Sequence, residues 1–250
     1  NQKANISSTA FQNCTAQSGG GGAVSASSVA QFLATDITVR DCVTPVPGAG
    51  MLLRGTQASL QTSTFLSNTA NGNGGAIDFR NGTLSIGQCV FSGNVALLGG
   101  VGGGVHAEYS TVDVFNSTLH TNTAGFCGGA FSSLHSAVTL RNSSLIDNNA
   151  NAGGGLYIDS SQSTNLYGMR FHHNTAVTHG GGAYVTWRTS LTGTSTMFTN
   201  NIATSGNGAG LYMEGLSAGY AATVVMSHVT AAGNTANAGG GGAVYLHSEA

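Results

Sequence analysis

The chain has 250 residues, of which 39 are Gly and only two are Pro, and 40% are apolar. It holds seven Lys and Arg against nine Asp and Glu, with no basic run, so we expect neither nucleic acid nor an anionic membrane as a partner. Its apolar runs are shorter than the roughly 20 residues of a membrane-spanning helix, so no membrane span is predicted. The chain opens at Asn1 in a polar stretch, and we expect it to be processed or cut from something longer.

A repeated motif divides the chain into coils. It reads apolar, two variable residues, Asn, one variable residue and Ala, followed by a glycine run and an apolar strand. The copies at 11–16 (FQNCTA) and 39–42 (VRDC) carry Cys in the Asn position, and 65–70 (FLSNTA) with GGAI at 74–77 is the clearest full copy. The motif positions 14, 42, 68, 94, 122, 148, 174, 201 and 234 lie 26 to 28 residues apart, except for the last interval of 33. This spacing predicts about nine stacked coils.

Within a coil, the residue alternation is that of strands. Apolar and polar residues alternate with period two at 77–79, 84–86, 112–114 and 156–158, and glycine or Asn-Gly turns separate such runs. Three short strands per coil are predicted. One coil cannot bury its apolar face alone, so coils should stack about 4.8 Å apart. The expected fold is an all-β, right-handed, single-stranded parallel β-helix, forming one domain over residues 1–250 without evident capping coils.

Like residues should align in inward columns along the stack. An apolar column is predicted from Phe11, Val39, Phe65, Phe91, Leu119, Leu145, Phe171 and Phe198. A second column holds the motif Asn residues, whose amides can donate to the next Asn and to turn backbone, so that burial leaves no polar group unpaired. The members of this Asn column are Asn68, Asn94, Asn122, Asn148, Asn174, Asn201 and Asn234.

The paired F-x-x-N and G-G-A-[ILV] motifs resemble the repeats of the polymorphic outer membrane proteins. The resemblance covers residues 11–247, nearly the whole chain, although some glycine motifs are loosened, as at 208–210 (GAG). It implies a right-handed β-helix displayed on a bacterial surface as an adhesive or structural solenoid. The same motifs also occur in β-helices of other origin, so the resemblance defines the fold better than the source.

Cysteine positions favour an oxidising, extracellular compartment. Cys14 and Cys42 occupy one coil position a turn apart, so their Cα atoms should be about 5 Å from each other, within disulfide range. We expect this bond, with two reduced thiols in the Asn column as the alternative. Cys89 belongs to an inward column of small residues, where a buried free thiol is expected. Cys127, beside a glycine turn, has no obvious partner.

Five Asn-x-Ser/Thr motifs occur, about as many as chance would give. Their positions are more informative than their number. Asn116 and Asn142 occupy one outward site in adjacent coils, and Asn81 lies at an exposed turn. These three are the candidate N-glycosylation sites of a secreted chain.

A polysaccharide lyase or hydrolase of this fold would gather acids, bases or calcium ligands on one outer sheet. The column expected to face outward is Ser25, Leu52, Asp78, His106, Ser132, Tyr157, Tyr184, Tyr212 and Tyr245. The column beside it contains Arg54, Arg80, Glu108, Asp159 and Glu214. Only Asp159 and Glu214 suggest a carboxylate pair, two coils or roughly 9.6 Å apart. A carbohydrate-active β-helix enzyme is therefore kept as the alternative function.

Four consecutive coils carry Tyr157, Tyr184, Tyr212 and Tyr245, which we interpret as a ligand face for sugar rings or a protein partner. The competing interpretation is that such a column only stabilises neighbouring strands. His172, His173 and His179 are interpreted as scattered surface residues, because adjacent strand residues face opposite sides and no Cys or carboxylate joins them. No metal and no cofactor is predicted. A calcium-binding nonapeptide repeat is excluded, because it would need an aspartate in every repeat and these repeats have none.

The function expected from these features is a non-catalytic, extracellular structural or adhesive solenoid that contacts glycans or cell-surface molecules. Neither end of the sequence shows a cap. If Asn1 of one copy followed Ala250 of another, the glycine run at Gly241 would lie 20 residues before the next Phe11, against 17 between Gly74 and Phe91. This register predicts head-to-tail stacking into a filament, with a slice of one longer solenoid as the alternative.

Overall fold

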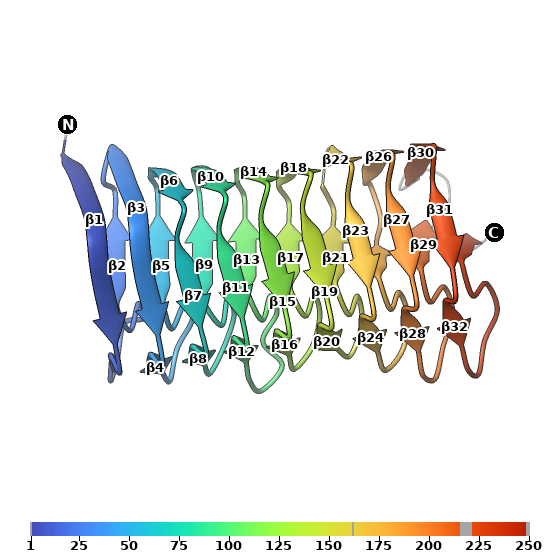
Figure 1. Ribbon diagram of the computed structural model, residues 1–250, viewed down its shortest axis with the longest axis horizontal. Helices are drawn as coiled ribbons and strands as arrows, with labels where there is room; N and C mark the ends of the chain where they lie inside the picture. The colour runs from blue at the N-terminus through green and yellow to red at the C-terminus, as the bar shows by residue number, and fades with distance from the viewer. Residues whose placement is uncertain (1, 162, 216–221, 249–250) are drawn as a thin grey trace.

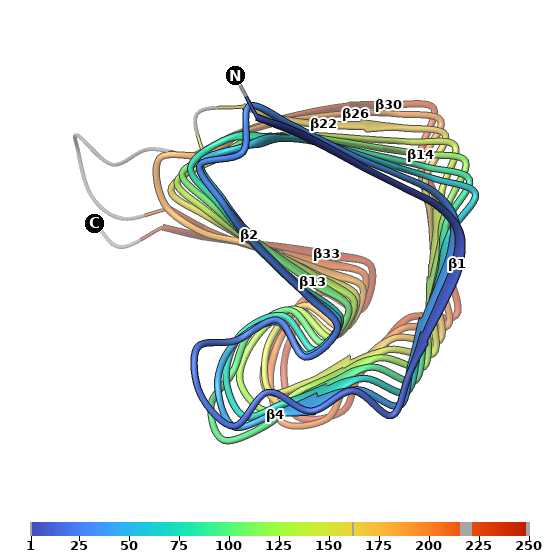
Figure 2. The same cartoon turned by 90° about the vertical axis from the view of Figure 1, so that its left-hand side faces the viewer.

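The computed structural model describes residues 2–161, 163–215 and 222–248. Its coils lie one after another along a single axis, with the two chain ends at opposite ends of the stack (Figure 1). Viewed from the N-terminal coil, the chain turns clockwise as it recedes, so the solenoid is right-handed (Figure 2). All strand pairs of the described residues are parallel, and this part of the chain contains no helix, hence none that could cross a membrane. The predicted parallel β-helix of nine coils is confirmed.

The first sheet has 16 strands and forms two of the walls seen end-on in Figure 2. Its first two coils contribute one long strand each, β1 (Lys3–Gln12) and β3 (Gln31–Arg40). One wall continues with β6 (Gln57–Gln61), β10 (Thr83–Gly87), β14 (Thr111–Phe115), β18 (Ala137–Arg141), β22 (Thr164–Tyr167), β26 (Ser190–Thr194) and β30 (Thr223–Ser227). The other continues with β7 (Thr64–Leu66), β11 (Val90–Ser92), β15 (Thr118–His120), β19 (Ser144–Ile146), β23 (Arg170–His172), β27 (Met197–Thr199) and β31 (Thr230–Ala232).

From the third coil on, each coil has four strands, not the predicted three. The chain bends between the two walls of the first sheet at a residue with positive φ, as at Thr62 (φ 48°) and Gln88 (φ 54°). This left-handed conformation turns the strand by one corner without interrupting the stacking of coils. The sequence did not reveal the bend, because most of the residues that occupy it are not glycine.

The second sheet has short strands, and the third sheet has longer ones. The second contains β4 (Val43–Thr44), β8 (Thr69–Ala70), β12 (Val95–Ala96), β16 (Thr123–Ala124), β20 (Asn149–Ala150), β24 (Thr175–Ala176), β28 (Ile202–Ala203) and β32 (Thr235–Ala236). The third contains β2 (Val24–Ser27), β5 (Met51–Arg54), β9 (Ile77–Arg80), β13 (Val105–Glu108), β17 (Phe131–Leu134), β21 (Leu156–Asp159), β25 (Ala183–Val185), β29 (Leu211–Gly215) and β33 (Val244–Ser248).

The core is built from columns of identical or similar side chains. Phe65 pairs in register with Val39 on one side and Phe91 on the other, as predicted for the apolar column. The rings of Phe65 and Phe91 stack with centroids 4.7 Å apart, and Phe171 and Phe198 repeat this geometry. All four rings are fully buried. Because each coil covers the apolar face of its neighbours, stability depends on the stack and not on any one coil.

The outward column of the third sheet is covered in the coils from Leu52 to Ser132, which corrects the expectation that these residues face solvent, whereas Ser25 is exposed as expected. Leu52, Asp78, His106 and Ser132 are at most 3% exposed. The glycine-rich loop that leads into each strand curls back against this face (Figure 2). At Gly128 (φ +68°), an added Cβ would lie 2.9 Å from the Cβ of Ser132, which shows how closely the loop backbone approaches.

The strands at the two ends of the stack have a neighbour on one side only. Strand β1 pairs with β3 alone, and β30, β31, β32 and β33 each end their ladder. Asn1 and Ala250, between which the predicted filament junction would form, lie outside the described residues. End-to-end stacking therefore stays a prediction.

Candidate functional site

The tyrosine face lies on the outer side of the third sheet in the last four coils. Tyr157, Tyr184, Tyr212 and Tyr245 are in direct register on β21, β25, β29 and β33. Tyr184 meets Tyr157 and Tyr212 edge-on, with centroids 5.5 and 4.8 Å apart, whereas Tyr212 and Tyr245 stack in parallel at 5.6 Å. The structure thus joins the four predicted tyrosines into one continuous aromatic ladder.

Polar groups hold this ladder from the side. The Tyr184 hydroxyl donates a hydrogen bond to the carboxylate of Glu214. His179, from the loop before β25, stacks on Tyr212 with centroids 4.4 Å apart. Its Nδ1 accepts a hydrogen bond of 3.0 Å from the Asn207 backbone N–H. The sequence did not assign His179 to this site, because it lies five residues before Tyr184 in a loop that has no strand alternation.

The electrostatics of the face keep the phenols of Tyr184 and Tyr212 neutral. Burial raises the pKa of Tyr212 to about 12, with the charge of Glu214 as a second cause. Burial, followed by the hydrogen bond to Glu214, also raises the pKa of Tyr184. Desolvation lowers the pKa of His179, which suits its role as an uncharged acceptor. The face therefore offers neutral hydroxyls and ring edges beside two carboxylates.

The two carboxylates of the enzyme alternative lie at this face and are both engaged. Asp159 accepts hydrogen bonds from Thr186 at 2.7 Å and from Ser160 at 2.8 Å. Glu214 accepts one from Tyr184. A glycosidase needs one carboxyl as acid and one as base or nucleophile around an open bond-cleavage position. In the structure, Asp159 is bonded to Ser160 beside it and to Thr186 of the next coil, and Glu214 is bonded to the tyrosine ladder.

A second polar cluster lies beneath the loops of the central coils, and the sequence did not predict it. Arg80 binds Asp78 through Nε at 2.9 Å and Glu108 through Nη1 at 3.1 Å. His106 lies in register between Asp78 and Ser132, is 1% exposed, and neither of its ring nitrogens has a hydrogen-bond partner. Charges at 78, 80 and 108 in adjacent coils were the available signal, but the sequence did not show that a loop buries Asp78 and His106.

Burial dominates the ionisation of this cluster. Desolvation raises the pKa of Asp78 to about 6, although Arg80 opposes the shift. Desolvation lowers the pKa of His106 to about 3, with the charge of Arg80 adding to it. At neutral pH, His106 is therefore an uncharged side chain buried beside an ion pair.

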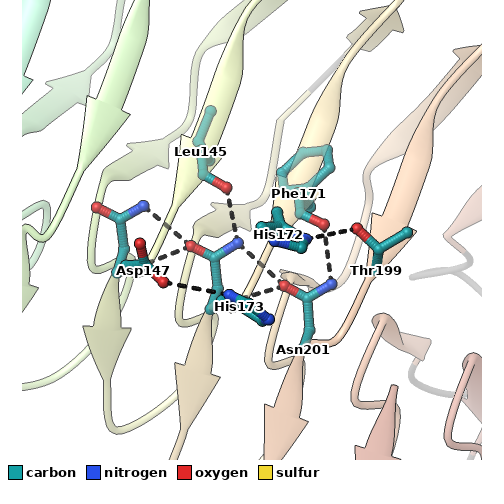
Figure 3. A network of polar contacts seen from close by, with 9 residues as sticks. Leu145, Asp147, Phe171, His172, His173, Thr199 and Asn201 are labelled. Atoms are coloured by element: carbon teal, nitrogen blue, oxygen red, sulfur yellow. Dashed lines mark hydrogen bonds and ion pairs between the residues drawn. The ribbon is translucent and has the colours of Figure 1, made fainter. Parts of the chain in front are cut away.

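The histidine pair His172 and His173 lies apart from both clusters. His172 Nδ1 lies 2.8 Å from the hydroxyl of Thr199, and His173 Nδ1 lies 3.6 Å from the half-exposed carboxylate of Asp147 (Figure 3). Among the described residues, no group of three or more His, Cys, Asp or Glu side chains is arranged to hold a metal ion.

The seven motif Asn residues form one hydrogen-bonded ladder through the interior. Asn174 Nδ2 donates to Asn201 Oδ1 at 3.0 Å and to the Leu145 carbonyl at 2.8 Å (Figure 3). The Asn174 backbone N–H donates to the same Oδ1 at 3.0 Å. The pattern repeats for Asn68, Asn94, Asn122, Asn148 and Asn201, and Asn234 closes the series. Each buried amide is thus paired on both sides.

All four cysteines are free thiols in the structure, including Cys14 and Cys42, for which a disulfide is predicted. The two nevertheless occupy the same position in adjacent coils, since the Val43 N–H donates to the Cys14 carbonyl. Burial raises the pKa of Cys42 to about 11. Cys89 and Cys127 are also buried. The Cys14–Cys42 bond stays a prediction.

The three candidate glycosylation sites are exposed. Asn116 (φ 49°) and Asn142 (φ 48°) occupy the bend of the first sheet in adjacent coils. Asn81 (φ 58°) occupies the corner between the third and first sheets. Asn is one of the few residues that adopts this left-handed conformation readily, so the backbone alone accounts for its presence at these corners.

In a comparison with known protein families, one coil of the chain matches a family of repeats. Residues 62–80 match the Chlamydia polymorphic membrane protein repeat. The matched segment contains β7, β8 and β9, with Asn68 of the ladder and the glycine pair Gly74 and Gly75. The resemblance to the polymorphic membrane protein repeat is therefore confirmed for this coil, and the β-solenoid it implies is the fold observed. No curated protein matches the chain.

Proposed function

We propose that this chain is a non-catalytic adhesive solenoid of a cell surface. Two observations support the proposal: a coil that matches the polymorphic membrane protein repeat, and a parallel β-helix that displays side chains at fixed spacing. The stack of coils acts as a rigid support because every coil is bonded to its neighbours by strand pairing and the Asn ladder joins the coils from Asn68 to Asn234. The side chains that vary from coil to coil then define what the surface contacts.

The aromatic ladder Tyr157–Tyr184–Tyr212–Tyr245 is the observation that carries the adhesive role. Rings with a hydroxyl, flanked by carboxylates, contact sugars and protein surfaces through apolar area and hydrogen bonds together. Tyr212 is only 5% exposed, so contact would be made by the partly exposed Tyr157, Tyr184 and Tyr245.

An adhesion assay tests this role. Beads coated with the purified chain should attach to host cells under flow, and Tyr157→Ser with Tyr245→Ser should reduce attachment severalfold. Tyr167→Ser is the matched control, because Tyr167 is 41% exposed on the first sheet, away from the ladder. If the Tyr157→Ser/Tyr245→Ser variant attached as well as Tyr167→Ser, the tyrosine face would not be the adhesive surface. If the native chain did not attach, the adhesive role would be wrong.

The enzyme alternative has its own test. Incubation of the chain with plant, bacterial and animal polysaccharides should release no new reducing or unsaturated ends. Release that is abolished by Asp159→Asn or Glu214→Gln would replace the adhesive proposal with a carbohydrate-active enzyme.

A further inference from the structure

The edge of the solenoid formed by the second sheet and its loops carries no charge from the second coil to the seventh. The segments that build this edge are 43–50, 69–76, 95–104, 123–130, 149–155 and 175–182, and none of them contains Lys, Arg, Asp or Glu. Burial of this edge would therefore desolvate no ion, so an apolar surface can cover it without that penalty.

Four large apolar side chains are exposed close together on this edge. Leu98 is 84% exposed, and Val43, Leu97 and Phe126 are between 44% and 51% exposed. Val43, Leu97 and Leu98 line one hollow. The Phe126 N–H donates to the Gly100 carbonyl at 3.0 Å, so Phe126 lies beside the same loop. These four residues form an apolar patch, and an exposed cluster of this kind is typical of a protein interaction site.

Leu98 lies at the tip of a loop that projects from this edge. Its coil is two residues longer than the coils on either side, 28 residues against 26. The loop between β12 and β13 extends beyond those of the neighbouring coils (Figure 1). A hydrogen bond of 2.8 Å from the Gly100 N–H to the Leu97 carbonyl closes the turn, and Leu98 has a φ of 47°. A bulky side chain rarely adopts this left-handed conformation, so the turn displays Leu98 at a conformational cost.

An apolar hollow of about 420 Å³ lies directly beside this loop. Among its lining residues are Val43 and Pro45 of the second coil, Thr69 and Asn71 of the third, and Leu97 of the fourth. Its volume is in the range of ligand-sized sites and exceeds that of a leucine side chain. A projecting apolar residue and an apolar hollow therefore lie side by side on one surface.

Backbone hydrogen bonds determine the order of these features along the axis. The Asn71 N–H donates to the Thr44 carbonyl. The Leu97 N–H donates in the same way to the Ala70 carbonyl, so positions 45, 71 and 97 are equivalent in successive coils. The hollow is therefore centred on the third coil, whereas Leu98 belongs to the fourth coil.

This order makes the edge complementary to itself. A twofold axis that crosses the surface midway between the third and fourth coils exchanges the fourth coil with the third and the fifth with the second. Leu98 of each copy then faces the hollow of the other copy. Phe126, in the fifth coil, faces Val43 and Pro45 in the second.

We infer that a second copy of this chain covers the apolar patch in an antiparallel, twofold-symmetric dimer, with Leu98 of each copy in the hollow of the other. A flat bilayer would leave the hollow unfilled, and a charged partner would find no opposite charge on this edge. Two copies bring no like charges together here. The dimer does not depend on the adhesive role, because a structural solenoid with the same edge would pair in the same way.

The area of contact indicates a reversible dimer. Six coils of each copy overlap around the twofold axis, which is about 29 Å at 4.8 Å per coil, and about five extended residues per coil give a width of about 16 Å. Two such footprints bury close to about 1,000 Å², before the relief of the loop and the hollow is counted. This area is at the lower end of specific interfaces, where transient complexes are found.

Sedimentation equilibrium of the purified chain tests for the dimer. We expect a monomer–dimer equilibrium with a Kd of roughly 10–100 μM. Leu98→Asp should raise this Kd at least about tenfold, because it brings a charge into an apolar hollow, and it should leave the melting temperature unchanged, because Leu98 is exposed in the single chain. Met197→Asp is the matched control: Met197 is 42% exposed on β27 of the first sheet, and the Kd should not change.

Cross-linking tests the antiparallel arrangement. Asn71→Cys or Asn151→Cys is introduced together with Cys14→Ser, because the other three native cysteines are buried. Across the twofold axis, the two copies of position 71 lie one coil height or about 5 Å apart along the axis, and those of position 151 lie five coil heights or about 24 Å apart. A short bis-maleimide should therefore link Asn71→Cys chains into dimers but not Asn151→Cys chains.

Four results would overturn the inference. The native chain is a monomer at every concentration, or Leu98→Asp associates as strongly as the native chain, as end-to-end stacking would. Efficient linking of both Asn71→Cys and Asn151→Cys chains would show copies that lie side by side in the same direction. A monomeric native chain that sediments with phosphatidylcholine vesicles, and loses this binding in Leu98→Asp, would show that a bilayer covers the patch instead.

Discussion

The side-chain amide of Asn122 donates to Asn148 Oδ1 across 3.0 Å, and the Asn122 oxygen accepts the corresponding bond from Asn94 at 2.9 Å. Asn122 also donates to the Phe91 carbonyl, so one buried side chain connects several coils. Asn122→Leu should therefore lower the free energy of unfolding by about 3–5 kcal/mol, because polar partners are left unpaired on both sides. Urea unfolding followed by circular dichroism measures this change.

The control for Asn122→Leu is Thr123→Ala in the same coil. Thr123 is exposed on β16, and its hydroxyl makes no hydrogen bond within the described residues. Its loss should change stability by less than about 0.5 kcal/mol. Ser132, which the sequence places in an outward column, is unsuitable as a surface control because it is buried. Equal effects of the two substitutions would contradict a stabilising ladder.

The Cys14–Cys42 disulfide should form when the chain is exposed to an oxidant. The bond would close a loop of 28 residues and stabilise the first two coils by about 3–4 kcal/mol. Because burial raises the pKa of the Cys42 thiol to about 11, oxidation should accelerate as the pH rises from 7 to 9. Mass mapping of non-reduced peptides detects the bond. Full alkylation of both thiols after prolonged oxidation would exclude it.

Asp78 and His106 should change the free energy of unfolding in opposite directions as the pH falls. The folded pKa of His106, about 3, is below its unfolded value of 6.5, so its contribution to stability is complete above pH 6.5 and decreases as the pH falls. The folded pKa of Asp78, about 6, is above its unfolded value of 3.8, so its contribution is complete below pH 3.8 and is lost as the pH rises through 6. Between pH 4 and 6, the two effects offset each other in the native chain.

Single substitutions should separate the pH dependence of the free energy of unfolding that is due to His106 from that due to Asp78. In Asp78→Asn, the free energy of unfolding should fall by on the order of 1.4 kcal/mol per pH unit from pH 6 to 4, because only the unfolded His106 binds a proton there. In His106→Gln, it should rise by a similar amount over the same range, because folded Asp78 takes up a proton. Arg80 and Glu108 are present in both variants. If the free energy of unfolding changed with pH in the same way in both variants, Asp78 and His106 would titrate in the folded chain as they do in the unfolded chain.

Glycosylation at Asn116 and Asn142 should be mutually exclusive on one molecule. The two side chains occupy the same corner of adjacent coils, about 4.8 Å apart along the axis, which is too close for two branched glycans. Secretion from eukaryotic cells followed by intact-mass analysis should show a glycan at one of the two and another at Asn81. Two glycans at 116 and 142 in one molecule, or none at any of the three, would refute this prediction.

Head-to-tail stacking predicts fibres of the isolated chain. Each copy would add nine coils, so electron micrographs should show an axial repeat of roughly 43 Å at 4.8 Å per coil. Growth should depend on concentration, because the strands at each end of the stack offer unpaired edges. A monomer that stays in solution across a dilution series in sedimentation experiments would exclude the filament.

The period of the repeat made the interior predictable from sequence. A fixed interval places Phe65 over Val39 and Asn94 over Asn68, and strand alternation assigns each residue to one side of its strand. Alternation does not tell what covers that side, which is why His106 and Asp78 were expected at the surface. The bend at Thr62 was missed for a related reason, since a left-handed residue other than glycine has a weak sequence signal.

The Asn ladder also makes the solenoid an electrically polar rod. From Asn68 to Asn201, each amide nitrogen donates to the Asn oxygen of the following coil, and from Asn94 to Asn234 each amide oxygen accepts from the Asn of the preceding coil. Strand dipoles in a sheet largely cancel, whereas these amides, each comparable to a peptide dipole of about 3.5 D, add head to tail. The axis therefore has a positive pole at Asn234 and a negative pole at Asn68. Such a rod orients in an electric field, and two of them side by side attract when they point in opposite directions.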